Sequence, residues 1–209
     1  NPEKVLSVGV NFSQQGYNVL SLSMRAHAES GGEYIGMGWL DRLDLLKWIN
    51  LIVSENPNSS IVLHGTSMGG ASVMMVSGEN LPSNVKAIVE ECGYTSVWDI
   101  FASELKLRFK LPAFPVLDMV NLVAMNRAGY NIKEASALNQ VKKSKVPILF
   151  IHGDVDDFVP VEMVYKLYNA ANCEKDILVV EGASHSEARY VDFEAYYSKV
   201  FSFVNKYVS

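Results

Sequence analysis

The chain has few cysteines, no long apolar run and no excess of basic residues. Its two cysteines, Cys92 and Cys173, are too few for a disulfide framework, and neither lies in a CxxC pair. No uncharged apolar run reaches the roughly 18 residues that a membrane-spanning helix needs. Lys and Arg number 18 against 23 Asp and Glu, whereas a nucleic-acid binder usually carries a basic face. We therefore expect neither a disulfide scaffold, nor a membrane-spanning chain, nor a nucleic-acid-binding protein.

What the sequence does contain is an ordinary globular mixture. Of its 209 residues, 49% are hydrophobic and 20% are charged, which is too apolar for a disordered chain. At roughly 150 residues for each domain, this length suggests one domain with an insertion rather than two domains.

Short apolar runs rich in β-branched residues alternate with stretches of helical period, a pattern typical of βαβ units. The pattern predicts a doubly wound, mostly parallel α/β sheet. Expected strands lie at residues 17–24, 61–63, 85–89, 147–151 and 176–180. Expected helices lie at residues 2–15, 39–53, 161–171 and 193–207, and a further one runs from the turn at 65–70 through residue 77. The alternation stops at residues 93–145, which we interpret as a helical cap inserted between two core parts, residues 1–92 and 146–209.

The pattern G-x-S-x-G occurs at residues 65–69, directly between an expected strand and an expected helix. A sharp strand-to-helix turn strains the backbone of its serine, and flanking glycines let the chain pass without a clash. Such a turn would expose the hydroxyl of Ser67 at a helix N-terminus, where the helix dipole favours negative charge. We predict that Ser67 is a nucleophile; the alternative is a glycine-rich packing turn.

A serine needs a base, and the base needs an orienting acid. In this architecture the chain order is Ser, acid, His. Of the four histidines, His185 alone follows all the later strands, so chain order selects it as the base. His64 and His152 end strands and are expected to be structural, and His27 is expected to stabilise a turn.

Residues 151–160, IHGDVDDFVP, offer three candidate acids. The segment resembles the HGxxDxxVP motif of α/β-hydrolases, and the match implies that Asp156 is the orienting acid. Asp154 and Asp157 are then expected to be loop carboxylates, and Asp154 is also the alternative acid.

The resemblance to α/β-hydrolase fold serine hydrolases covers nearly the whole chain. It includes the GASH loop that holds His185 and the RAHAES loop at residues 25–30, which resembles the family's RGHGxS. Through CGYTSV at residues 92–97 the chain is most similar to the serine aminopeptidase-like and Bem46-like hydrolases. Ala26 and Ala28 depart from this pattern because they replace glycines, and Ser23 stands where Asp is common.

The resemblance also implies an oxyanion hole made by the backbone N–H of Met68 and by a second N–H from a loop before the first helix. That loop, and a central strand between residues 17–24 and 61–63, have no counterpart in the chain as given. We therefore expect the natural protein to carry an N-terminal segment before Asn1, which would also hold any signal or anchor.

These observations predict a serine hydrolase that cleaves a carboxylic ester of a small molecule through an acyl-enzyme, with no cofactor and no metal. The alternatives are an aminopeptidase-like peptidase and a non-catalytic binding protein of the same fold. A peptidase would need a charged group to hold an amino terminus, and nothing in the sequence picks one of Glu90, Glu91 and Glu104. We expect a cytoplasmic location, with membrane contact only through the apolar residues 113–125 or a missing N-terminus; the oligomeric state is left open. Ten apolar cap residues are candidates to line the acyl pocket: Phe101, Leu105, Leu107, Phe109, Leu111, Phe114, Val116, Leu117, Met119 and Leu122.

Overall fold

The computed structural model describes residues 2–208, with side chains from residue 6 onward. Backbone contacts divide the chain into two compact units, Asn1–Ile35 and Gly36–Ser209. The predicted boundaries near residues 92 and 145 both fall inside the second unit and remain predictions.

Among its described residues, the first unit contains helix α1 (Pro2–Gln14), where the sequence predicted it. The ring of Phe12 meets the ring of Tyr17 edge to face, with centroids 5.4 Å apart, so the chain folds back at the helix end. Gly16, with φ 86°, makes this turn in the left-handed region that glycine adopts without strain.

The predicted strand at residues 17–24 is wrong, because this segment has no regular secondary structure. Its β-branched, alternating pattern favours an extended chain, but a strand also needs a neighbour that accepts and donates ladder hydrogen bonds. Among the described residues no strand pairs with this segment, and Val19 and Leu20 are half exposed.

In the loop that follows, the two alanines that replace glycines occupy a backbone conformation that suits glycine. Ala26 and Ala28 have φ of 57° and 49°, so both alanines adopt the left-handed conformation that a glycine would favour. The loop is closed by the N–H of Ala26, which donates to the carbonyl of Gly31 at 3.1 Å. His27 Nδ1 lies 2.9 Å from the carbonyl of Arg25, which is the turn-stabilising contact expected for this histidine.

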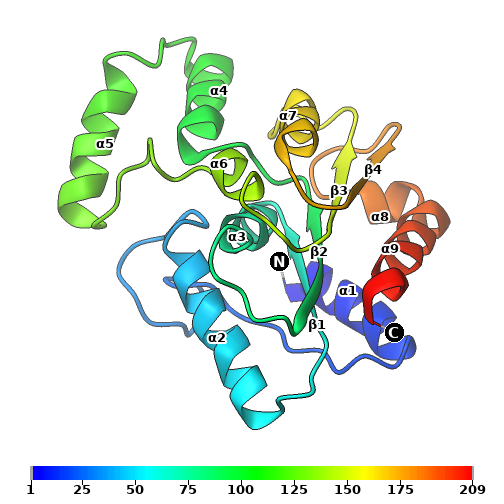
Figure 1. Cartoon of the computed structure of the whole chain (residues 1–209). Helices are drawn as coiled ribbons and strands as arrows, with labels where there is room; N and C mark the ends of the chain where they lie inside the picture. Colours follow the sequence, from blue (N-terminus) through cyan, green and yellow to red (C-terminus); the bar gives the residue numbers. More distant parts are fainter. Residues whose placement is uncertain (1, 209) are drawn as a thin grey trace. The chain divides into compact units, whose positions relative to one another are not determined.

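The second unit is built on a parallel sheet of four strands (Figure 1). The central strands β2 and β3 are almost wholly buried, which is expected where helices cover both faces of a sheet. Strand β1 stands at one edge, and the further strand expected beside it is not among the described residues and stays a prediction. The strands, in their order across the sheet, are β1 (Ile61–Thr66), β2 (Val85–Glu91), β3 (Ile148–Gly153) and β4 (Lys175–Val180).

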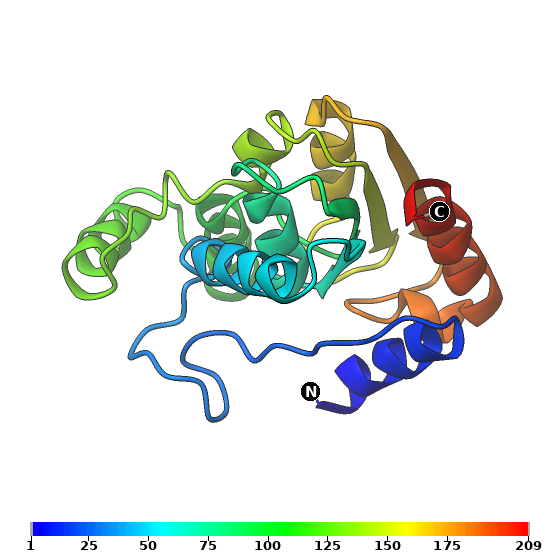
Figure 2. The ribbon, with the colours of Figure 1, turned by 60° about the horizontal axis from the view of Figure 1, so that its bottom comes forward.

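Helices pack on both faces of this sheet, as Figures 1 and 2 show, which confirms the doubly wound α/β prediction. Helices α3 and α7 lie on one face, and α8 and α9 on the other. All the helices predicted for this core are present, whereas the short α8 was not predicted. The helices are α2 (Asp41–Glu55), α3 (Met68–Val76), α6 (Ala137–Val141), α7 (Glu162–Ala170), α8 (Ala188–Val191) and α9 (Phe193–Val208).

Residues 93–145 are helical, as predicted, and contain α4 (Val97–Phe109) and α5 (Val116–Arg127) before α6 returns to the core. The side-chain oxygen of Ser96 accepts the N–H of Asp99 at 3.0 Å and so caps α4. Gln140 on α6 donates to the carbonyl of Met75 at 3.0 Å, which fastens the end of this interval to α3.

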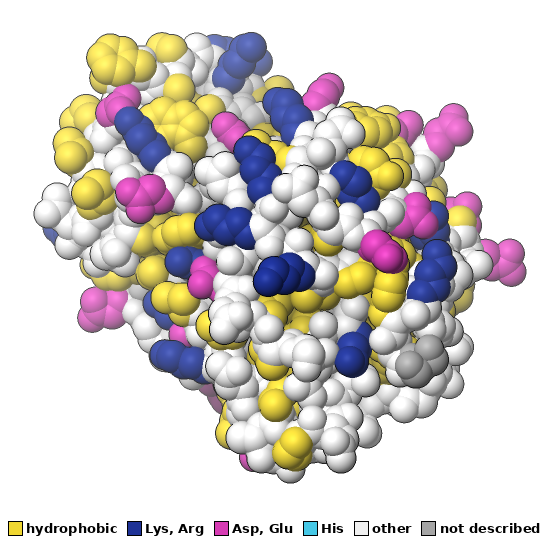
Figure 3. Space-filling view, viewed as in Figure 1, with side chains coloured by type: hydrophobic (Ala, Val, Ile, Leu, Met, Phe, Trp, Pro, Cys, Tyr) yellow, Lys and Arg dark blue, Asp and Glu magenta, His cyan; other side chains and the backbone are white. Residues whose placement is uncertain are grey.

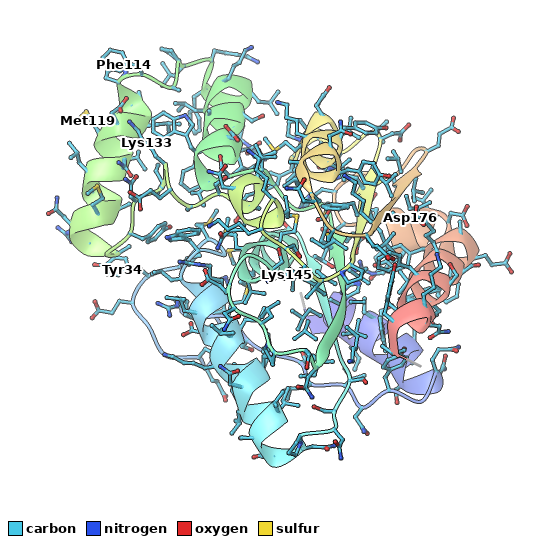
Figure 4. All side chains as sticks on the ribbon, viewed as in Figure 1. Tyr34, Phe114, Met119, Lys133, Lys145 and Asp176 are labelled. Carbon is cyan, nitrogen blue, oxygen red and sulfur yellow. The ribbon has the colours of Figure 1, made fainter. Side chains whose placement is uncertain are left out.

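Helix α5 buries one narrow face and exposes apolar side chains on the other. Leu117 is buried, and the buried amide oxygen of Asn121 accepts the N–H of Ile132 at 2.9 Å. Met119 and Leu122 are mostly exposed, as is Phe114 just before the helix. Figure 3 shows hydrophobic side chains gathered over this part of the unit, and Figure 4 shows Phe114 and Met119 on its outer side.

Across the described residues, none of the helices combines the length and the apolar character needed to cross a membrane.

Candidate active site

Ser67 stands at the sharp turn between β1 and α3. Its backbone has φ 58° and ψ -118°, a region that a non-glycine residue seldom occupies. Hydrogen bonds hold this conformation from both sides: the N–H of Ser67 donates to the carbonyl of Glu91 at 2.8 Å, and the carbonyl of Ser67 accepts the N–H of Ala71 at 2.9 Å. The predicted strained turn is therefore present, and it is fixed to the end of β2.

The first glycine of the G-x-S-x-G pattern is sterically required. A Cβ on Gly65 would lie 2.2 Å from the carbonyl oxygen of Gly69, closer than real Cβ contacts come. A Cβ on Gly69 would meet nothing within 4 Å. The two glycines thus have different roles, because Gly65 makes room for the backbone of Gly69.

The structure brings the three predicted catalytic residues together from three separate loops. Ser67 Oγ lies 2.8 Å from Nε2 of His185, and Nδ1 of His185 lies 2.8 Å from Oδ2 of Asp156. Because a carboxylate only accepts, Nδ1 donates to Asp156 and leaves Nε2 free to accept the serine proton. The ring of Phe158 lies against the imidazole, with centroids 5.1 Å apart.

The carboxylate of Asp156 is fully buried, and both of its oxygens accept hydrogen bonds. Its Oδ1 accepts the backbone N–H groups of Phe158 and Val159 at 2.9 and 2.8 Å. Burial alone would raise the pKa of Asp156, but hydrogen bonds from His152, His185 and these two N–H groups hold it well below its usual range. These hydrogen bonds therefore favour the ionised form of Asp156.

The other two aspartates of this loop tie it to the loop that carries His185. Oδ1 of Asp154 accepts the N–H of Gly182 at 2.7 Å, and Oδ1 of Asp157 accepts the hydroxyl of Ser184 at 3.4 Å. These contacts fit the predicted loop-carboxylate role, and it is Asp156 whose carboxylate meets the imidazole.

His64 and His152 have structural contacts, as the sequence predicted. His64 Nε2 lies 3.0 Å from the hydroxyl of Tyr196, and burial together with the charge of Arg189 lowers the pKa of His64 to about 3, so it stays neutral. His152 is fully buried and donates from Nε2 to the carbonyl of Val159 at 2.9 Å.

A cavity of about 440 Å³ opens beside Ser67. Of the ten cap residues expected to line an acyl pocket, Phe101 alone contributes to it. The expectation fails for the others because α4 turns one face to the cavity while α5 presents most of its apolar side chains outward. The lining residues are Met37, Ser67, Met68, Tyr94, Ile100, Phe101, Glu104 and Phe158.

Sequence reasoning missed a buried ion pair behind the site. Nη1 of Arg189 lies 2.5 Å from Oε2 of Glu91, and both side chains are 1% exposed. The hydroxyls of Thr66 and Tyr196 donate to the same carboxylate oxygen at 3.1 and 3.2 Å. The pair connects the end of β2 to α8, just after His185, and the isolated arginine in the sequence gives no signal of it.

One group of side chains has the composition of a metal site. Ligand atoms of Cys92, Asp156 and His185 lie within 4.8 Å of one another. The aspartate and the histidine already bond each other, and the Cys92 thiol is 1% exposed with its Sγ 3.3 Å from Oγ of Ser186. Burial raises the pKa of Cys92 well above its usual value, which disfavours the thiolate that a metal needs.

Comparison with known families identifies one model that spans almost the whole chain. The prolyl oligopeptidase family model matches residues 7–209. The uncharacterized protein YqkD of Bacillus subtilis is 28% identical over 176 residues, which cover 84% of this chain and 58% of that protein. The uncharacterized protein YfhR of Escherichia coli K12 is 26% identical over 180 residues, covering 84% of this chain and 55% of that protein. The chain thus spans little more than half the length of these relatives.

Solved structures match the fold closely. The Pyrococcus furiosus esterase Pf2001 superposes with a TM-score of 0.74 at 25% identity, covering 99% of this chain and 75% of that one. An esterase domain from Rhodothermus marinus gives 0.65 at 22% identity, covering 100% and 82%. The acylaminoacyl peptidase of Pyrococcus horikoshii gives 0.60 at 20% identity, covering 81% and 28%. These matches confirm the α/β-hydrolase fold expected from the motifs, and they include both esterases and a peptidase.

Proposed function

Because the chain belongs to the prolyl oligopeptidase family, we propose that it is a serine hydrolase that cleaves carboxylic esters. One observation carries the proposal: Ser67, His185 and Asp156 are joined by two hydrogen bonds of 2.8 Å at the edge of an apolar cavity. This is the arrangement that a serine nucleophile needs, with the base within reach of the hydroxyl and the acid holding the base.

In the proposed reaction Ser67 Oγ attacks the ester carbonyl and His185 Nε2 takes its proton. His185 then gives the proton to the departing alcohol as the tetrahedral intermediate collapses to an acyl-enzyme. A water molecule, activated by the same nitrogen, attacks the acyl-enzyme and releases the acid. Asp156 stays ionised throughout and stabilises the imidazolium that forms twice in each cycle.

The backbone N–H of Met68 is the proposed first donor to the oxyanion. Met68 is the first residue of α3, so its N–H has no acceptor within the helix and lies at the positive end of the helix dipole. The resemblance implies a second backbone N–H donor beside it. Since one such donor contributes about 100- to 1000-fold to the rate, the activity of the whole protein depends on both.

An ester is favoured over a peptide by the cavity itself. Its walls are mainly apolar side chains, including Ile100, Phe101 and Phe158, which suit an acyl chain of small or medium size. A peptidase activity is the second candidate, because the chain belongs to a family named for an oligopeptidase and one structural relative is an acylaminoacyl peptidase.

The first test is the intact mass of the protein before and after treatment with a fluorophosphonate. We expect the wild type to gain one probe and Ser67→Ala to gain none. Ser202→Ala, an exposed serine on α9, is the matched control and should be labelled like the wild type. An unlabelled wild type would contradict the proposal and favour the non-catalytic binding protein.

A second measurement separates the two substrate classes. The values of kcat/KM for p-nitrophenyl butyrate and for a p-nitroanilide with the same acyl group are compared. The rates of alkaline hydrolysis of the two compounds give their ratio of intrinsic reactivity. We expect the enzymatic ratio of kcat/KM, ester over anilide, to be larger than this intrinsic ratio. An enzymatic ratio below the intrinsic one would assign the protein to the peptidases.

A further inference from the structure

Glu104 is the one charged residue among the residues that line the cavity beside Ser67. Glu104 lies on α4 one turn after Ile100 and Phe101, so the three side chains share one face of the helix. The other polar side chains in the lining are Ser67 and Tyr94, and the hydroxyl of Tyr94 already donates to the carbonyl of Met37 at 3.1 Å. The cavity therefore has one acidic group in an otherwise largely apolar wall.

The Glu104 carboxylate is only half satisfied. Its Oε2 accepts from Nε of Arg108, one turn further along α4. Its Oε1 is buried and has no hydrogen-bond partner in the structure. A buried acceptor without a donor is uncommon in native proteins, since leaving it unpaired costs free energy that a bound donor would recover.

Arg108 pairs with Glu104 from a more exposed position on α4. The Arg108 side chain is 58% exposed while the Glu104 side chain is 17% exposed, and Arg108 is not among the lining residues. Its guanidinium lies 5.7 Å from the ring centroid of Phe158. The helical ion pair thus accounts for Oε2 and leaves Oε1 without a hydrogen-bond partner.

We propose that Glu104 makes this site selective for substrates that carry a positively charged ammonium group. This inference rests on the proposed ester hydrolysis and names its substrate class. An ammonium group donates to Oε1 and meets the negative charge in surroundings of low polarity, where their attraction is stronger than in water. A carboxylate on the substrate would be repelled, and a neutral acyl chain would leave Oε1 unpaired.

The test compares p-nitrophenyl esters of one chain length that end in a methyl, an ammonium or a carboxylate group. We expect kcat/KM to be about tenfold higher for the ammonium ester than for the neutral one, and lowest for the carboxylate ester. A choline-type ester, which carries the ammonium group on the alcohol side, shows whether Glu104 binds the acyl side or the alcohol side of the scissile bond. Selectivity on either side supports the proposal.

Glu104→Gln should lower kcat/KM for the ammonium ester about tenfold more than it lowers kcat/KM for the neutral ester. Glu194→Gln, an exposed glutamate on α9, makes the same change in net charge and should leave all ratios unchanged. Arg108→Gln should keep the preference for the ammonium ester. The proposal would be overturned if Glu104→Gln left the ratios of kcat/KM between the esters unchanged. It would also be overturned if the wild type preferred the carboxylate ester and Arg108→Gln lost that preference.

A binding measurement separates this inference from the catalytic proposal. Hexylammonium should raise the melting temperature of Ser67→Ala more than hexanol does, and Glu104→Gln in the same background should abolish the difference. Hydrolysis of neutral esters without this difference would overturn the role of Glu104 alone. If hexylammonium stabilises the protein more than hexanol but the wild type is not labelled by the fluorophosphonate, only the proposed hydrolysis is overturned.

Discussion

His152 and Asp156 lie side by side in the interior, with Nε2 of the imidazole 3.4 Å from Oδ2 of the carboxylate and both side chains 0% exposed. His185 contacts the same oxygen from the other loop at 2.8 Å. Two imidazoles thus share Oδ2, while the backbone holds Oδ1. The acid is fixed by groups that do not react, so the contact with His185 can be altered without loosening the loop.

Asp156→Asn is therefore expected to keep the fold and lose most of the activity. The amide oxygen can still accept the two backbone N–H groups, but the amide nitrogen cannot accept from Nδ1 of His185. The ring would then turn its N–H toward Ser67 and could no longer take the serine proton, which costs about 10⁴ in kcat in a comparable triad. The measurement is kcat on a p-nitrophenyl ester, with the melting temperature recorded alongside.

Asp154→Asn is the matched control for this substitution. Asp154 bonds the N–H of Gly182 and not the imidazole, so its amide variant should retain kcat within about tenfold. A large loss in Asp154→Asn with a mild effect in Asp156→Asn would reassign the acid.

The sequence predicts those parts of the fold and site that depend on local pattern. Apolar runs at residues 61–63 and 147–151 lie between helical segments, so β1 and β3 are found where they were expected. The five-residue motif selects Ser67 and chain order selects His185, and the structure places these two side chains within hydrogen-bond distance. None of these predictions needs a distant contact.

The features that were missed depend on distant contacts. Residues 17–24 have the composition of a strand but no partner among the described strands. Glu91 and Arg189 pair across 98 residues of sequence, and neither residue alone suggests the other. The role of Glu104 depends on the rotation of α4 about its own axis, which determines that Ile100, Phe101 and Glu104 face the cavity while Leu107 is exposed.

Glu90→Gln is predicted to change how stability depends on pH. Burial raises the pKa of Glu90 to about 7 from 4.5, although the charge of His152 and the N–H of Gly93 act in the opposite direction and Glu91 adds to the increase. Between pH 4.5 and about 7 the folded chain therefore holds a proton that the unfolded chain has lost. The free energy of unfolding should fall as the pH rises through this window, by up to about 3 kcal/mol at 1.36 kcal/mol for each pKa unit.

The glutamine variant cannot titrate at this position, so its stability should not show this fall. Urea unfolding at pH 4.5 and pH 8.5 measures the effect as a gain in Glu90→Gln relative to the wild type that is larger at the higher pH. Glu162→Gln, at an exposed position on α7, should run parallel to the wild type. Equal differences at both pH values would show that folding does not raise the pKa of Glu90.

Arg189→Met is expected to destabilise the protein by about 3 to 5 kcal/mol, because it leaves the charge of Glu91 buried without its cation. The double variant Glu91→Gln with Arg189→Met should be less destabilised than Arg189→Met, since no unpaired charge then remains. Denaturant unfolding of the two variants and the wild type gives the comparison. Arg127→Met, exposed on α5, should stay within about 0.5 kcal/mol of the wild type. A double variant less stable than Arg189→Met would contradict the assignment of the loss to an unpaired charge.

Leu117 and Leu122 offer a test of how α5 packs. The two leucines lie on one helix, but Leu117 is 3% exposed and Leu122 is 60% exposed. Replacement by alanine changes helix propensity equally at both sites, so any difference in stability reports burial. We expect Leu117→Ala to lower the free energy of unfolding by about 2 to 5 kcal/mol and Leu122→Ala to change it by less than about 0.5 kcal/mol. Equal losses measured by urea unfolding would mean that the outer face of α5 is covered in solution, and a loss that grows with protein concentration would identify a second copy of the chain as its cover.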